Sequence, residues 1–138
     1  IEVFNLANTK VDKINEYDKV ILGGSTWGDG ELNDDWEDAW VDFCKLDLSN
    51  KTVALFGLGD QESYSDEFCS ALGEIYKQVV TLGAKVIGFT STEGYHHDAS
   101  KAQIDNNFVG LVIDEDNQSE LTDKRIEDWV QNIKEDIL

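Results

Sequence analysis

Two short apolar runs, each leading into a glycine-rich loop, limit what this chain can fold into more than any other feature. The runs cover residues 19–24 and 52–57, and each is followed by a loop with one large aromatic side chain, Trp27 in the first and Tyr64 in the second. Continuous apolar runs of this length are typical of strands buried on both faces of a parallel sheet. Residues with helical spacing follow both loops, so we expect successive strand–helix–strand units.

The rest of the chain continues this alternation of strand and helix patterns. Strands are expected at residues 1–6, 19–24, 52–57, 85–89 and 108–113. Helices are expected to begin at residues that favour helix caps, namely Asn33 or Asp34, Ser65 or Asp66, and Thr122. Residues 7–17 indicate a loop with at most one helical turn, and residues 91–107 indicate a polar excursion. We therefore expect one domain, residues 1–138, with helices on both faces of an α/β sheet.

The net charge limits the partners that this chain can have. With 29 acidic and 11 basic side chains, the formal net charge is −18 at pH 7. Such a surface repels nucleic-acid phosphates and anionic lipids, and it attracts basic proteins at rates that fall as salt increases. No apolar run approaches the ~20 residues of a membrane span. We expect basic protein partners, no nucleic acid and no membrane; the alternative is that the charge serves only solubility or a saline habitat.

Two further features bear on where the protein works and where its chain begins. Cys44 and Cys69 fall on apolar helix faces, so both are expected to be buried, reduced thiols of a cytoplasmic protein. The sequence contains no methionine, and Ile1 resembles an internal residue rather than the first residue of a natural chain. We therefore expect that further residues precede Ile1 in the natural protein.

Metal sites are not expected from this sequence. An acidic run begins at Asp114, but an EF-hand loop needs glycine at its sixth position and glutamate at its twelfth, where Ser119 and Arg125 stand. His96 and His97 are adjacent, so their side chains point apart on a strand, and neither cysteine lies at a metal-ligand spacing. Neither a calcium loop nor a zinc site is therefore expected.

Three motifs, in order along the chain, resemble those of flavodoxins. Residues 25–32 and 35–37 resemble the first loop that contacts the isoalloxazine ring in that family, and residues 57–61 and 64–66 resemble the second. Residues 108–118 resemble the C-terminal signature of the family, which continues at residues 121–122, 125–126 and 129–130. The excursion at residues 91–107 is similar to the insertion into the last strand that marks long-chain flavodoxins.

The resemblance implies a flavodoxin-like, doubly wound parallel sheet of strand order 2-1-3-4-5, in a protein that carries single electrons on FMN and is not an enzyme. Trp27 would cover one face of the flavin, and Tyr64 would stack on the other. Backbone groups around Gly28, Leu58, Gly59 and Asp60 would meet the ring edges, and Asp116 would hydrogen-bond the ribityl chain. The full set of expected FMN-binding residues is Ser25, Thr26, Trp27, Gly28, Asp29, Gly30, Leu58, Gly59, Asp60, Tyr64 and Asp116.

The same resemblance implies the kind of partner. A flavodoxin exchanges electrons with the basic surface of a redox protein, such as a flavodoxin reductase or another oxidoreductase, and works as a monomer. This agrees with the partner class that the net charge of −18 favours.

The sequence departs from the family pattern before Lys19. Flavodoxins open with a strand and a loop rich in Thr, Ser and Gly that holds the FMN phosphate at a helix N-terminus. Nothing before Lys19 resembles that loop, and residues 1–6 align with the second strand of the family. The first strand, which would lie in the middle of the sheet, is therefore expected to be missing from residues 1–138. Either residues before Ile1 supply it or the fold is rearranged, and no residue is assigned to the phosphate.

Two other interpretations of the sequence stay open at this point. A flavodoxin-like module that binds proteins but no flavin would explain the absent phosphate loop, and Trp27 and Tyr64 would then only cap the edge of the sheet. A phospho-accepting receiver domain would need a reactive aspartate at the end of the strand before the first glycine loop, where Gly24-Ser25-Thr26 stands.

Overall fold

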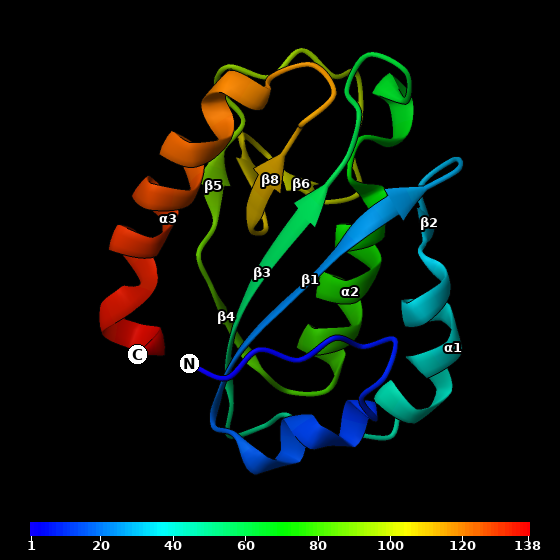
Figure 1. The fold of residues 1–138 in the computed structure, drawn as a ribbon, viewed down its shortest axis with the longest axis vertical. Coiled ribbons are helices and arrows are strands. Elements are labelled where there is room, and N and C mark those ends of the chain that lie inside the picture. Colours follow the sequence, from blue (N-terminus) through cyan, green and yellow to red (C-terminus); the bar gives the residue numbers. More distant parts are fainter.

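The computed structural model describes residues 1–138 and contains a mostly parallel sheet with helices on both faces (Figure 1). Its main strands are β1 (Lys19–Trp27), β3 (Thr52–Leu58), β4 (Lys85–Ile87) and β8 (Leu111–Ile113). β3 lies at the centre of this group, since it pairs in parallel with the other three. A short strand, β2 (Glu31–Leu32), pairs antiparallel with the end of β1. The predicted α/β class is confirmed.

β4 and β8 pair with different halves of β3. Residues 52–54 of β3 pair with β4, and residues 56–58 pair with β8. The chain between them forms a small antiparallel sheet of β5 (Thr90–Ser91), β7 (Asn107–Phe108) and β6 (Gln103–Ile104), in that order. The polar excursion predicted at residues 91–107 therefore separates two strands that both extend the main sheet beside β3.

Three α-helices and three 3₁₀-helices complete the fold. They are α1 (Asp34–Phe43), α2 (Ser70–Thr81), α3 (Thr122–Ile137), η1 (Val11–Glu16), η2 (Ser65–Glu67) and η3 (Ser119–Leu121). Asn33 caps α1 as predicted, because its side-chain oxygen accepts a hydrogen bond from the Trp36 amide at 3.1 Å. The helix predicted after residue 120 is also confirmed. η1 lies within residues 7–17, where at most one helical turn is predicted, and its six residues exceed that prediction because they form two 3₁₀ turns.

The predicted caps of the other two helices are wrong. α2 begins only at Ser70, after Cys69 in the left-handed region with φ +52°. The Ser65 hydroxyl does not cap the helix, because it accepts a hydrogen bond from the amide of Asp98, which is distant in the sequence. Thr122 is the first residue of α3, and its hydroxyl makes no hydrogen bond within the protein.

Alternating side chains of β3 supply two apolar cores on opposite faces of the sheet. Val53 and Leu55 lie in the larger core with residues of α1 and α2, whereas Ala54 lies in the smaller core with Trp129 and Ile133 of α3. Cys69 is buried in the larger core, where desolvation raises the pKa of its thiol. Cys44 is only partly buried, so the burial predicted for both cysteines is confirmed for Cys69 alone.

The strand predicted at residues 1–6 is absent. This segment forms no strand pairs, and the side chains of Ile1 and Val3 are 91% and 89% exposed. A strand needs a hydrogen-bonded neighbour along its edge, and this segment pairs with none. The free edge of β1 is also unpaired over residues 19–25, because β2 contacts only Thr26 and Trp27.

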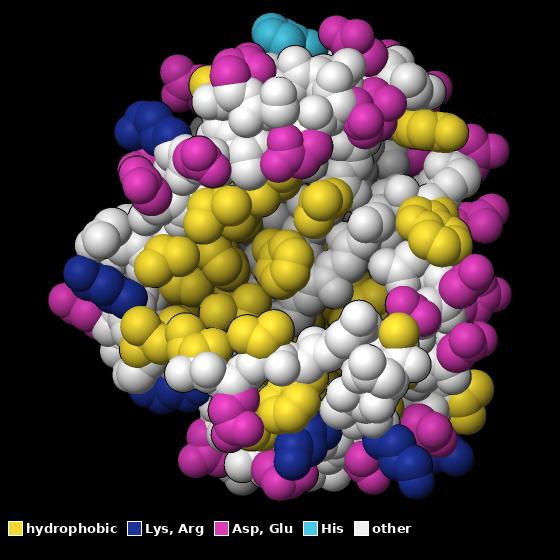
Figure 2. All heavy atoms as spheres, in the orientation of Figure 1, with side chains coloured by type: hydrophobic (Ala, Val, Ile, Leu, Met, Phe, Trp, Pro, Cys, Tyr) yellow, Lys and Arg dark blue, Asp and Glu magenta, His cyan; other side chains and the backbone are white.

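An apolar groove lies along the free edge of β1. Figure 2 shows it as a hollow lined by hydrophobic side chains in the middle of the face that carries α3. Its volume is about 920 Å³, and its walls include residues 1–6, Ile21, Phe56, Ile137 and Leu138. None of the three helices covers it, whereas α3 covers the same face of the sheet over β3 and β8. No helix in the structure has both the length and the apolar content to span a membrane.

Candidate functional site

Two loops meet at the carboxyl edge of the main sheet. β1 and β3 are parallel neighbours in a register that places Ser25 opposite Leu58, so the chain segments after both strands emerge at the same edge. β1 continues through a tight turn at residues 28–30 into β2, and β3 continues into residues 59–64. Ligands of open α/β sheets bind at this kind of edge. We call these two segments the hairpin loop (residues 27–31) and the second loop (residues 58–64).

The hairpin loop has a backbone that depends on glycine. Gly28 and Gly30 have φ values of +53° and +88°, which side chains with a Cβ rarely adopt. A Cβ on Gly30 would lie 2.6 Å from Oε2 of Glu67 and 3.0 Å from the Cβ of Ser70, so this turn also packs closely against the start of α2. Trp27 is the last residue of β1 rather than part of the turn, and it pairs with Glu31.

The other residues predicted in the first motif have different environments. Ser25 is paired with Leu58 inside the sheet. The Thr26 hydroxyl accepts a hydrogen bond from the Ala71 amide at 3.2 Å, so this side chain already serves the first turn of α2. Asp29 is exposed at the tip of the hairpin loop, and its carboxylate makes no hydrogen bond within the chain.

Asp60 closes the second loop. Its Oδ1 accepts hydrogen bonds from the amides of Glu62 and Ser63, at 3.1 and 3.0 Å, and from Nδ2 of Asn117 at 2.8 Å. The Ser63 amide, followed by the Asn117 side chain, holds the pKa of Asp60 below its usual value. The amide of Gly59 donates to the carbonyl of Ile113 at 3.1 Å and so belongs to the sheet.

Trp27 on the hairpin loop and Tyr64 on the second loop have aromatic side chains that are exposed to solvent. They are 50% and 46% exposed, and neither packs against another aromatic ring. Most of the other aromatic side chains pack in pairs, as Trp36 does with Phe43 at a centroid distance of 5.1 Å. Large, exposed apolar rings at one sheet edge are typical of a ligand site. Their placement on the two loops fits a flat ring bound between them.

A third segment borders the second loop, and sequence analysis found only part of it. Asp116 is exposed and makes no hydrogen bond within the chain. Asp114 was not predicted, yet it is fully buried and accepts hydrogen bonds from Gln61 and Asn117. The signal for it was an aspartate placed directly after the apolar run of residues 108–113, at a position where a buried strand ends.

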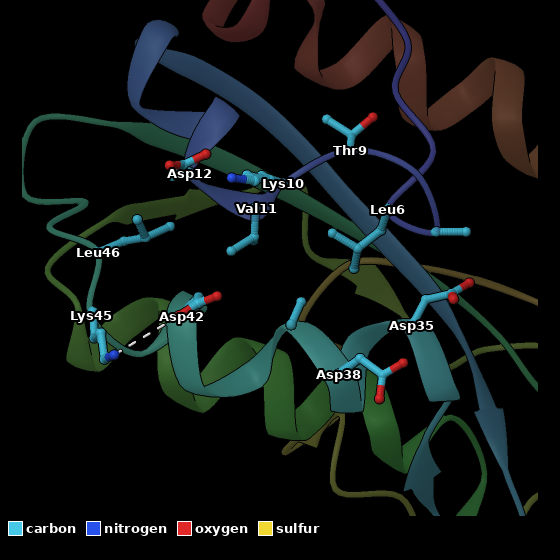
Figure 3. Close-up of a pocket in the computed structure, with 12 residues that line it drawn as sticks. Leu6, Thr9, Lys10, Val11, Asp12, Asp35, Asp38, Asp42, Lys45 and Leu46 are labelled. Carbon is cyan, nitrogen blue, oxygen red and sulfur yellow. Dashed lines mark ion pairs between the residues drawn. The ribbon is translucent and has the colours of Figure 1, made fainter.

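Two pockets in other parts of the molecule are separate from these loops. One is the groove along β1. The other, of about 510 Å³, lies between residues 6–12 and α1, and Figure 3 shows Asp35, Asp38 and Asp42 along its α1 side. Lys45 forms an ion pair with Asp42 at 3.9 Å there. Neither pocket contains a residue of the hairpin loop or of the second loop.

Comparison with known proteins identifies the family. The flavodoxin family model matches residues 1–129. The chain is 45% identical over 134 residues to the flavodoxin of Picosynechococcus sp., which covers 97% of this chain and 79% of that protein. It is 44% identical over 137 residues to flavodoxin 1 of Escherichia coli K12, covering 99% of this chain and 78% of that protein.

A solved structure agrees with the sequence relatives. The crystal structure of Fusobacterium nucleatum flavodoxin bound to flavin mononucleotide superposes with a TM-score of 0.94 at 37% identity, covering 99% of this chain and 81% of that one. The carboxyl edge of the sheet, where Trp27 and Tyr64 lie, therefore belongs to a fold that is known from a solved structure. This chain belongs to the flavodoxin family, and it is an electron-transfer protein rather than an enzyme.

Proposed function

We propose that this chain carries single electrons at low potential on FMN, whose isoalloxazine ring lies between Trp27 and Tyr64. The observation that carries the proposal is the pair of half-exposed aromatic rings on adjacent loops at the carboxyl edge of the sheet. The flavin-bound F. nucleatum flavodoxin, with the same fold, supports FMN as the ligand. No residue among 1–138 is assigned to the phosphate group.

The protein groups around the ring bind it and adjust its electronic environment. Bound FMN supplies the one-electron chemistry. Each stacked aromatic side chain stabilises the complex by on the order of 1 kcal/mol beyond the burial of its surface. Trp27 and Tyr64 also exclude water from the two faces of the ring, which strengthens every electrostatic interaction at its edges.

The backbone of the hairpin loop can change which group it presents to the ring edge. Gly28 has φ +53°, and a Cβ there would meet nothing closer than the Glu31 carboxylate group at 3.6 Å. The peptide between Gly28 and Asp29 can therefore turn over without a steric clash and present either its carbonyl or its N–H. Such a turn would match a change in protonation at the ring edge that accompanies electron uptake.

Nearby carboxylates favour a low potential. Reduction adds negative charge to the ring, and a negatively charged protein disfavours this. Salt screens charges beyond ~8–10 Å, so the net charge of −18 acts mainly through the closest groups. On the two loops and on the segment after β8, the carboxylates closest to the ring are those of Asp29, Glu31, Asp60, Glu62 and Asp116.

The partners that fit this surface are redox proteins with a basic docking face. Members of the family exchange electrons with other redox proteins, and the acidic groups on both loops surround the aromatic pair where a partner must approach. Attraction between unlike charges speeds association and orients the encounter. The reduced state of Cys44 and Cys69 supports a place in the cytoplasm.

We further propose that another parallel strand lies against β1 and fills the groove, as the sheet order 2-1-3-4-5 requires. Residues 19–25 of β1 have one unpaired edge, and the groove beside it is lined mostly by apolar side chains. Unpaired backbone groups and exposed apolar surface both destabilise a fold. With that strand, residues 1–138 would form part of one flavodoxin-like domain. In the natural protein, the added strand would give every amide of residues 20–24 a hydrogen-bond acceptor, so all of them should exchange slowly with solvent. If only every second amide exchanged slowly, no strand would lie against the free edge of β1.

A titration of the natural protein with FMN tests the proposed function. Binding should perturb the visible absorption of the flavin, and Trp27→Ala should weaken it. An unperturbed flavin spectrum at saturating protein would contradict the proposal.

A further inference from the structure

A buried carboxylate lies directly behind the second loop. Asp114 follows β8 and has no exposed surface. Its Oδ2 accepts hydrogen bonds from the amide and Nε2 of Gln61, at 3.1 and 2.7 Å. Its Oδ1 accepts one from the amide of Asn117 at 3.0 Å, and Nδ2 of Asn117 lies 3.1 and 2.9 Å from the two oxygens. Both oxygens therefore have hydrogen-bond donors.

The charge on this carboxylate has no cationic partner. All of its donors are neutral amides, and Asp114 takes part in no ion pair. An ionised carboxylate only accepts hydrogen bonds, and this set of donors matches that state. Amide donors compensate for the burial of an ionised carboxylate without cancelling its charge.

The same network joins three segments that are far apart in the sequence. Asn117 Nδ2 also donates to Asp60 at 2.8 Å, which links the carboxylate to the turn of the second loop. Gln61 Oε1 accepts a hydrogen bond from the His96 amide at 2.6 Å. This bond links the Asp114 carboxylate, through Gln61, to the excursion between β4 and β8. The second loop is thus fixed from behind through Gln61 and Asn117, and both depend on Asp114.

We propose that Asp114 is a positioning residue for the flavin site, and that its buried charge also lowers the reduction potential of the bound flavin. This inference rests on the proposed function. Loss of the carboxylate would leave the amide and Nε2 of Gln61 and the amide of Asn117 without an acceptor, so the second loop and Tyr64 would lose their fixed position. Loss of the charge would remove a repulsion on reduced flavin that water and salt screen poorly, because the group is buried.

Two variants separate position from charge. Asp114→Asn removes the charge and turns an acceptor into a donor, whereas Gln61→Met removes both side-chain hydrogen bonds of Gln61, to Asp114 and from the His96 amide, and keeps the charge. Asp136→Asn is the matched control, because it removes one exposed carboxylate at the far end of α3 (Figure 1). The readouts are amide hydrogen exchange of Gln61, His96 and Asn117 in the protein without FMN, and the dissociation constants of oxidised and fully reduced FMN.

Asp114→Asn should speed exchange of the three amides at least tenfold. It should also lower the ratio of the dissociation constants, reduced over oxidised, about tenfold, which equals about 30 mV in a two-electron midpoint potential. Gln61→Met should speed exchange by a similar factor and change the ratio less than threefold. The control should change neither quantity by more than twofold.

Other outcomes would overturn the proposal. Unchanged exchange in Asp114→Asn or Gln61→Met would remove the positioning role, and a ratio no different from that of Asp136→Asn would remove the role of the charge. If Asp114→Asn does not fold, Gln61→Met decides through the Asn117 amide, which donates to Asp114 and not to Gln61: unchanged exchange of that amide overturns the proposal and faster exchange supports it. A wild-type protein that does not bind FMN would contradict the proposed function instead, and the exchange data on that protein would still decide the positioning role.

Discussion

The hairpin loop and the second loop lie side by side at the sheet edge, yet they are held in different ways. The hairpin loop turns on Gly28 and Gly30, and its exposed Asp29 makes no hydrogen bond within the chain. The second loop is closed by Asp60 and fixed from behind by the Asp114 network. One loop can therefore change its peptide orientation while the other keeps its place. An electron carrier needs both properties. Electron uptake changes the edge of the flavin ring, whereas the flavin must keep its position relative to the redox partner.

The largest effect is expected for Gly30→Ala in the hairpin loop. The variant combines an unfavourable φ of +88° with a contact of 2.6 Å to Glu67, so it should lower the free energy of unfolding by about 2 kcal/mol. Gly94→Ala is the control, because it has a similar φ of +91° and no atom closer than 3.7 Å. Chemical denaturation measures both. Equal losses would show that the packing of the turn against α2 does not matter.

The aromatic side chains test whether both loops contribute to one site. Trp27→Ala and Tyr64→Ala should each weaken FMN binding about tenfold or more, through lost stacking and lost burial of apolar surface. Val41→Ala on α1 serves as a control, since Val41 is exposed and lies outside both loops. Fluorescence titration gives the three dissociation constants. If only one aromatic variant weakens binding, the ring is held by one loop alone.

Salt dependence tests the charged groups on and beside the two loops. The association rate with a basic redox partner should fall several-fold between low and physiological ionic strength. Replacing Asp29 and Glu31 by their amides should weaken this dependence about as much as replacing Glu62 and Asp66, because both pairs are exposed beside the aromatic rings. Stopped-flow kinetics supplies the rates. A rate that does not change with salt would mean that the acidic surface serves solubility only.

The smallest effect is expected for Asp60→Asn. The pKa of Asp60 is lowered in the folded protein, so its carboxylate stabilises the fold above the pKa of an unfolded aspartate, and this contribution disappears as pH falls through the lower, folded pKa. Because the group is partly exposed, the loss at pH 7 should be only about 0.5 kcal/mol. Denaturation at several pH values measures it. A difference from wild type that grows towards low pH would contradict this sign.

Much of the fold follows from local patterns in the sequence. The apolar runs before Trp27 and Tyr64 and the capped stripe after Asn33 predicted β1, β3 and α1, because strand burial and helix capping depend on neighbouring residues. The strand predicted at residues 1–6 failed for a different reason. A strand forms only against a partner, and no pairing partner lies beside that segment in the structure.

The candidate site was only partly predictable for a similar reason. Both aromatic residues and the glycines stand out in the sequence, since their chemistry is local. The start of α2 was predicted too early, because Ser65 binds the amide of Asp98, 33 residues further along the chain. Asp114 and Gln61 are 53 residues apart, and their contact appears only once β3 and β8 pair. Burial of a charged group is a property of the packed fold and not of the residues beside it.

A crystal structure of the natural protein with FMN would show where the flavin binds. We expect the isoalloxazine ring to lie between Trp27 and Tyr64, with each ring centroid about 4.5–7 Å from the flavin, as stacked aromatic groups require. A flavin bound elsewhere, or one that contacts neither side chain, would show that this aromatic pair does not form the site.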